Sequence, residues 1–71
     1  MNGYEKEMEA AKKFIADHKV DITFMNYYEK IKDSSLMHSE KWSLMYDFMA
    51  SHYPEERTVV TGLVYLMENE R

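Results

Sequence analysis

Residues 4–53 read YEKEMEAAKKFIADHKVDITFMNYYEKIKDSSLMHSEKWSLMYDFMASHY and contain neither glycine nor proline. Gly3 and Pro54 border this run. Glycine and proline are the residues that most often interrupt regular structure, so a run of this length, rich in Glu, Lys, Met, Leu and Ala, favours helices joined by polar turns. The sequence therefore predicts an all-α fold, a compact bundle of about four short helices, in which residues 1–71 form a single small domain.

The size of the chain limits how it can be stabilised. It has 71 residues, and a domain of about this size buries only about 60% of the surface that its unfolded chain exposes. Cysteine is absent, so disulfides and thiolate metal sites are excluded. Seven methionines, six tyrosines, three phenylalanines and one tryptophan can bury large areas. We therefore expect stability from dense packing or from self-association.

The charge pattern is that of an ordinary solvated surface. The net charge of −4 comes from 13 acidic and 9 basic residues spread along the chain, which argues against binding to phosphate backbones or anionic lipids. Residues 1–13 lack the apolar segment of a secretory signal, and no apolar run approaches the length of a transmembrane helix. We expect a cytoplasmic protein that does not bind membranes.

Apolar residues at helical spacing predict a first helix over residues 3–18. Asn2 and Glu5 have the spacing of a capping box at its start. One face of this helix would carry Tyr4, Met8, Ala11, Ile15 and His18.

A second helix is predicted over residues 22–32, with Asp21 as its N-cap. Val20 would pack on Met25 as a hydrophobic staple. The buried face would consist of Phe24, Tyr28 and Ile31.

A third helix is predicted over residues 36–53, and it begins either at Asp33–Ser35 or at Ser39. On a helical projection its large side chains occupy about 200° of arc, whereas a surface helix needs little more than about 100°. Only Glu40, Ser43, Asp47, Ala50 and Ser51 remain for water. This helix is therefore either central to the domain or half of an interface. The residues within the arc are Met37, His38, Trp42, Leu44, Met45, Tyr46, Phe48, Met49, His52 and Tyr53.

The fourth element is predicted as a helix over residues 55–68. Pro54 suits the first helical position, and Glu55 and Glu56 complement the positive end of the helix dipole. The alternative is a β-hairpin within residues 57–67, because the β-branched run Thr58–Thr61 followed by Gly62 also suits a strand and turn.

No catalytic, metal or cofactor motif stands out. His38 and His52 would lie about 21 Å apart on one continuous helix, so they could not share an ion. The fold leaves little room for a cleft that encloses a substrate, and neither a Ser-His-Asp order nor a glycine-rich phosphate loop is present. We expect no enzyme activity and no cofactor.

A helix-turn-helix formed by residues 22–53 is the alternative function, that of a DNA-binding transcriptional regulator. The outward residues of its second helix include Glu40 and Asp47 and no Lys or Arg. Two carboxylates would be repelled by phosphates, so nucleic-acid binding is disfavoured.

Elimination and the wide arc of residues 36–53 together predict a small regulator, adaptor or inhibitor that binds a protein partner, as a homodimer. Free-standing acidic domains of this size are typical of accessory proteins of bacteria or phages. Aromatic and Met side chains are enriched at interface centres. The predicted interface residues are Trp42, Met45, Tyr46 and Met49 at the centre, with Tyr53 and Tyr27 at the margins.

Overall fold

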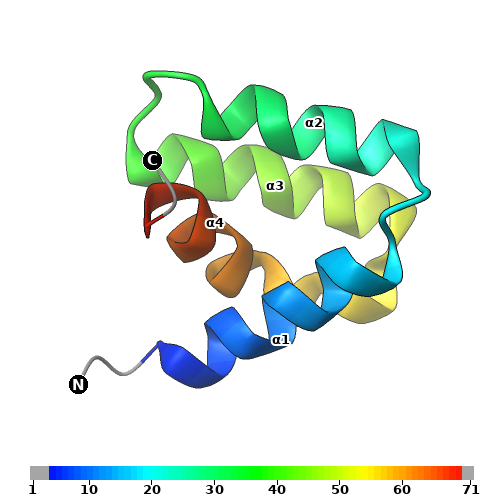
Figure 1. Ribbon diagram of the computed structural model, residues 1–71. Coiled ribbons are helices and arrows are strands. Elements are labelled where there is room, and N and C mark those ends of the chain that lie inside the picture. Colours follow the sequence, from blue (N-terminus) through cyan, green and yellow to red (C-terminus); the bar gives the residue numbers. More distant parts are fainter. Residues whose placement is uncertain (1–3, 70–71) are drawn as a thin grey trace.

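The computed structural model describes residues 4–69, and all of its regular elements are helical (Figure 1). The all-α prediction is confirmed, and helices cover well over half of the chain. Residues 4–69 contain no strand, so the alternative of a C-terminal β-hairpin is wrong. The elements are α1 (Glu5–Asp17), α2 (Ile22–Lys32), α3 (His38–His52), the 3-10 helix η1 (Pro54–Val59) and α4 (Val60–Asn69).

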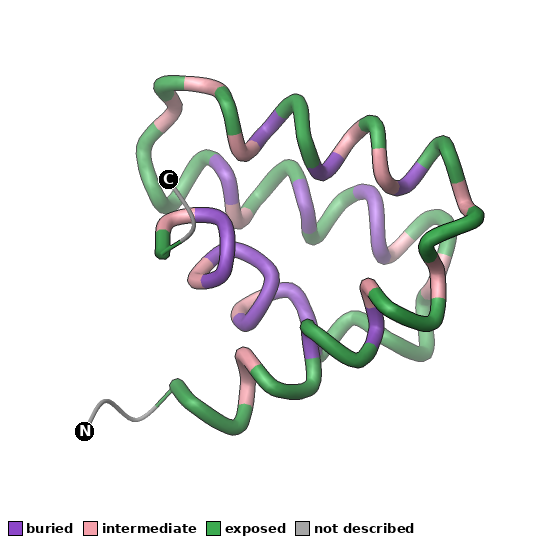
Figure 2. The backbone as a smooth tube through the Cα atoms, viewed as in Figure 1, coloured by how far each residue is buried: buried purple, intermediate pink, exposed green. Residues whose placement is uncertain are grey.

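Helix α4 is the centre of the bundle. Figure 1 shows α2 and α3 side by side and antiparallel, with α4 between that pair and α1. Figure 2 shows buried residues along nearly all of α4, whereas α1, α2 and α3 each alternate between buried and exposed positions. The short, apolar α4 is therefore surrounded, and the longer α3 has a face left for solvent. The fully buried side chains of α4 are Val60, Leu63, Val64 and Met67.

Gly62 sets how closely α4 approaches α1. A Cβ atom on Gly62 would lie 2.0 Å from the carbonyl oxygen of Glu7 and 3.1 Å from the Cβ of Ala11. Ala11 itself is completely buried. The two helices thus cross with a backbone-to-backbone contact that only glycine allows, and this contact explains a glycine inside a helix.

The start of α2 confirms one sequence prediction and contradicts another. The Asp21 carboxylate accepts a hydrogen bond from the backbone N–H of Phe24 at 3.1 Å, so Asp21 is the N-cap. Val20, however, is 90% exposed. The predicted staple between Val20 and Met25 is therefore wrong, because the turn before α2 directs Val20 into solvent. The predicted capping box of α1 involves Asn2, which lies outside the described residues.

Helix α3 begins at His38, one residue before the later of its two predicted starts. The Glu40 carboxylate accepts a hydrogen bond from the backbone N–H of Met37 at 3.0 Å, which satisfies a donor at this helix end. Ser34 belongs instead to the end of α2, since its hydroxyl donates to the carbonyl oxygen of Ile31 at 2.7 Å.

The predicted fourth helix is divided in two. Pro54 stands at the start of η1 with Glu55 and Glu56 in its first turn, as predicted. Glu56 has non-helical backbone angles (φ −112°, ψ 20°), and the regular α-helix begins only at Val60. The β-branched residues that suggested a strand lie at this junction, where their low helix propensity is compatible with a tighter 3-10 turn.

We predict that Gly62→Ala destabilises the protein although alanine is the better helix former. Helix propensity favours the change by about 1 kcal/mol, but the added Cβ forces α1 and α4 apart at a cost of about 2 kcal/mol or more. The net loss of about 1 kcal/mol or more should lower the thermal midpoint by at least roughly 5 °C in a circular-dichroism melt. Ala10→Gly, on the exposed side of α1, measures the propensity effect alone. A Gly62→Ala protein as stable as the wild type would contradict the crossing described above.

Candidate protein-interaction surface

Met45 and Met49, predicted at the centre of an exposed face, are both 0% exposed. They belong to the core, because α4 packs against the side of α3 that carries them. Their place on a surface is therefore a prediction that the structure corrects. Much of the wide apolar arc of α3 is explained by α2 on one flank and α4 on the other.

Tyr53 also points inward from the end of α3. Its hydroxyl donates a hydrogen bond to the Asp21 carboxylate. Its ring makes edge-to-face contacts with Phe14 at 5.2 Å and with His18 at 4.9 Å between ring centroids. Tyr53 therefore ties the end of α3 to the ends of α1 and α2, and because the residue is only half-buried, its place at the margin of an interface stays a prediction.

The Tyr53 bond perturbs both of its partners. The pKa of Asp21 lies below its usual value of 3.8, chiefly because of the hydrogen bond from Tyr53 and next because of the backbone N–H of Phe24. The same bond raises the pKa of Tyr53 above 10.0. Both shifts favour the ionised carboxylate next to the neutral phenol.

Of the remaining predicted residues on α3, Trp42 is half-buried and Tyr46 is exposed. Their rings stack with centroids 5.1 Å apart and an angle of 11° between planes. The indole N–H of Trp42 donates to the hydroxyl of Thr61 on α4 at 3.2 Å, and Tyr46 is 36% exposed. The hydrogen bond to α4 thus fixes the indole, and the more exposed ring of Tyr46 stacks on it.

Further aromatic rings continue this pair along the same flank of α3. The His38 ring lies 5.0 Å from the ring of Tyr65 on α4, and Tyr65 stacks on Tyr4 at 4.0 Å. His38, Trp42 and Tyr46 are four residues apart, so they follow one stripe of α3. We call the set the aromatic face. It consists of Tyr4, His38, Trp42, Tyr46 and Tyr65.

Polar contacts hold together the part of the aromatic face that contains His38, Tyr65 and Tyr4. The Nδ1 atom of His38 lies 2.9 Å from the Glu68 carboxylate on α4. The hydrogen bond with the Tyr4 hydroxyl raises the pKa of Tyr65 above 10.0. Sequence reasoning missed Tyr4 and Tyr65, because rings on separate helices share no periodic signal. His38 was not among the predicted interface residues either, although its four-residue spacing from Trp42 is present in the sequence.

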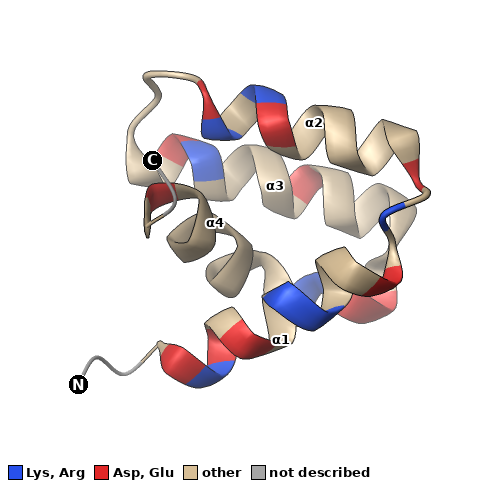
Figure 3. Ribbon diagram, viewed as in Figure 1, with Lys and Arg blue, Asp and Glu red and all other residues tan. Residues whose placement is uncertain are grey.

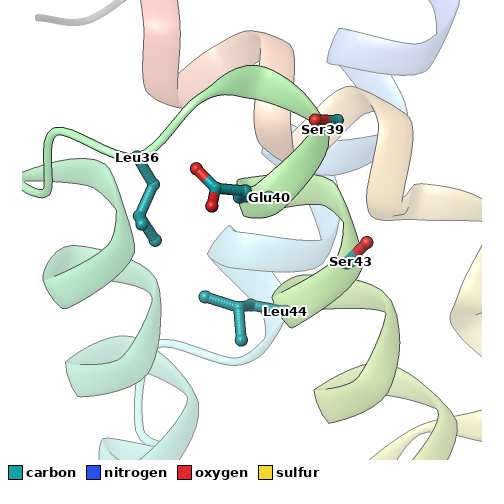
Figure 4. A pocket seen from close by; sticks show the side chains of 5 residues that line it. All are labelled: Leu36, Ser39, Glu40, Ser43 and Leu44. Carbon is teal, nitrogen blue, oxygen red and sulfur yellow. The ribbon is translucent and has the colours of Figure 1, made fainter.

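The opposite flank of α3 carries a groove against α2. Leu36 and Leu44 line two adjoining hollows of about 350 and 210 Å³. Tyr27 and Ile31 complete the apolar wall on the side of α2. Figure 4 shows Leu36, Glu40 and Leu44 pointing into the space between the two helices, and Ser39 and Ser43 complete the lining of the first hollow. We call this feature the α2–α3 groove.

Tyr27 belongs to the groove rather than to the aromatic face. Its ring stacks on Phe48 at 4.9 Å, and it is half-buried between α2 and α3. Of the six predicted interface residues, the structure brings only Trp42 and Tyr46 together on one exposed surface.

The exposed charge of α3 is acidic (Figure 3). Its one lysine, Lys41, is 1% exposed and lies within the core. Glu40 and Asp47 are exposed. Sequence reasoning missed the burial of Lys41, because a long aliphatic stem lets a lysine occupy a core position without an apolar signature.

His18 and His52, at the ends of α1 and α3, line one hollow together with Tyr53. Each Nδ1 donates to the carbonyl four residues earlier, Phe14 for His18 at 2.7 Å and Phe48 for His52 at 3.1 Å. Within residues 4–69, however, no three His, Cys, Asp or Glu side chains are placed to share a metal ion. The contacts given above make these imidazoles helix-end caps.

The chain matches no protein-family model, and no curated protein or solved structure is significantly similar to it. Among residues 4–69, none of the helices has both the length and the apolar composition required to cross a membrane.

We predict that Tyr53→Phe lowers stability in a pH-dependent way. The folded-state pKa of Asp21 is depressed, so its contribution is present above its unfolded pKa near 3.8 and is lost as the pH falls through the folded value. Removing the phenol removes the chief cause of that depression. The difference in thermal midpoint between wild type and Tyr53→Phe should therefore be largest at neutral pH and shrink below about pH 4.

The matched control for this experiment is Tyr27→Phe, which removes the phenol of a half-buried ring that stacks on Phe48. Its difference from the wild type should not change between neutral and acid pH. A gap for Tyr53→Phe that stays constant over the same range would show that Asp21 gains nothing from the phenol.

Proposed function

We propose that this protein binds another protein through its aromatic face and acts as a small regulator, adaptor or inhibitor by covering a surface of that partner. The observation that carries the proposal is the stacked pair of Trp42 and Tyr46 on α3, in which Trp42 is half-buried against α4 and Tyr46 is exposed. Aromatic rings are the side chains most enriched at interface centres, where a desolvated Trp or Tyr contributes much of the binding energy.

The way the aromatic face is held supports the same proposal. The bond from Trp42 to Thr61 and the contact between His38 and Glu68 attach the face to α4, the most buried helix. Side chains that are already fixed lose little conformational entropy when a partner covers them. The face is therefore suited to binding with little rearrangement.

The surface charge bears on what the partner can be. Glu68 borders the aromatic face, where it contacts His38. A carboxylate in this place favours a partner with a basic residue beside an apolar centre. The exposed charges of α3, Glu40 and Asp47, lie on the side of the helix away from Trp42. They disfavour the alternative of a helix-turn-helix DNA-binding regulator, because α3 would present carboxylates rather than lysine or arginine to the phosphates.

We predict that a photo-crosslinking amino acid at position 46, introduced in the native host, captures one partner protein that the same amino acid at position 51 does not. Ser51 is exposed on the same helix and lies outside the aromatic face.

With the purified partner, Tyr46→Glu should weaken binding by roughly tenfold or more, because a carboxylate would be desolvated at the interface centre. Ser51→Glu, which adds the same charge, should bind nearly as the wild type does.

The thermal midpoint of Tyr46→Glu should stay close to that of the wild type, since the side chain is exposed. Equal capture from positions 46 and 51, or equal weakening by the two substitutions, would count against the aromatic face. Binding of duplex DNA at low salt, with a steep loss on adding salt, would favour the DNA-binding alternative instead.

A further inference from the structure

The α2–α3 groove offers a second apolar surface, separate from the aromatic face. Leu44 is 37% exposed in it, and Met37, which follows Leu36, is 70% exposed. Tyr27 and Ile31 form the wall on α2, and the two hollows beside Leu44 and Leu36 can accept side chains from outside. An apolar groove of this kind on a small domain is typical of an interaction site.

The two rims of the groove carry opposite charges. Lys30 on α2 lines the hollow next to Leu44, and Glu40 on α3 lines the adjoining hollow. Among the residues that the structure describes, neither Lys30 nor Glu40 takes part in an ion pair. The basic rim belongs to one helix and the acidic rim to the other, with the two leucines between them.

A two-fold axis that runs along the groove would bring these rims together. In a two-fold dimer each surface patch meets its own copy, and rotation about this axis places the α2 rim of one subunit opposite the α3 rim of the other. Lys30 of each copy would then face Glu40 of the other, while the leucines meet at the centre. A peptide of one charge sign would complement only one rim, so the pattern favours a second copy of this chain as the occupant.

We propose that this protein self-associates through the α2–α3 groove as a two-fold dimer. Leu44 of each copy packs into the groove of the other, and Lys30 pairs with the partner's Glu40. The aromatic face lies on the other flank of α3 and stays free in this dimer. The inference is independent of the proposed function, and its failure leaves that proposal standing.

Self-association is tested by sedimentation of the full chain across a series from low micromolar to millimolar concentration. The wild-type mass should rise from 8.6 kDa towards twice that value. Leu44→Glu should raise the dissociation constant by roughly tenfold or more, because two carboxylates would meet at the centre of the interface. Tyr46→Glu, on the aromatic face, should dimerise as the wild type does.

Charge reversal provides the sharper test, because it can be rescued between subunits. Lys30→Glu alone and Glu40→Lys alone each place like charges opposite one another and should dimerise more weakly than the wild type. An equimolar mixture restores opposite charges at both contacts of a mixed dimer. Native mass spectrometry, with one variant isotope-labelled, should therefore show mixed dimers in excess of either self-dimer.

The mixing experiment distinguishes a lost contact between subunits from a loss of stability within one subunit. Glu40 also accepts a hydrogen bond from Met37, so Glu40→Lys costs some stability, but a lost cap in one chain cannot be repaired by adding a second chain. Lys6→Glu, an exposed change of equal charge on α1, should neither weaken the dimer nor enrich mixed dimers.

A wild type that stays monomeric throughout the series would overturn the proposal. So would a dimer that Tyr46→Glu disrupts while Leu44→Glu and the charge reversals leave it intact, since that dimer would use the aromatic face.

Discussion

The rest of the structure depends on the close crossing of α1 and α4 at Gly62. A Cβ at this position would overlap the backbone of Glu7, so the distance between the two helices is set by the absence of a side chain. Close approach lets the short α4 bury most of its side chains, with α1 on one side and the α2–α3 pair on the other (Figures 1 and 2). A domain this small gains from such an arrangement, because one apolar helix contacts all three of the others.

The central position of α4 decides what α3 presents to solvent. Met45 and Met49 turn towards α4 and become core, and the side chains on either side of them are left at the margins of the contact. On one margin the rings of Trp42 and Tyr46 stack on each other. On the other margin Leu44 faces the hollow beside α2. A single broad apolar arc is thus divided into a buried centre and two separate exposed flanks.

Each flank has its own chemistry, and the two proposals follow from this difference. The aromatic face joins rings from α1, α3 and α4, fixed by hydrogen bonds and bordered by Glu68. The α2–α3 groove is lined by leucines and lies between Lys30 and Glu40. Within the described chain neither of these two residues takes part in an ion pair. A dimer formed through the groove would carry two copies of the aromatic face, so a partner with repeated sites would be held by both at once.

Sequence alone determined the features that depend on neighbours along the chain. The absence of glycine and proline from residues 4–53 predicts helices, the carboxylate of Asp21 predicts a helix start, and Pro54 predicts the next one. All of these are confirmed, because caps and breakers act within one turn of the backbone. Trp42 and Tyr46 were likewise singled out from the wide arc of residues 36–53.

Tertiary structure alone decided which large side chains are covered. The periodicity of α3 could not distinguish Met45, which is buried, from Tyr46, which is exposed, because a helical pattern does not say where the neighbouring helices stand. Because the positions of the neighbouring helices are not in the pattern, the sequence also did not predict that Tyr4 and Tyr65 lie in the aromatic face. For the same reason it did not predict the bond from Tyr53 to Asp21 or the burial of Lys41. Gly62 shows most clearly that a contact between helices is not predicted by the sequence alone. In the sequence it suggested a turn, and only the approach of the α1 backbone shows that it is the contact point of two helices.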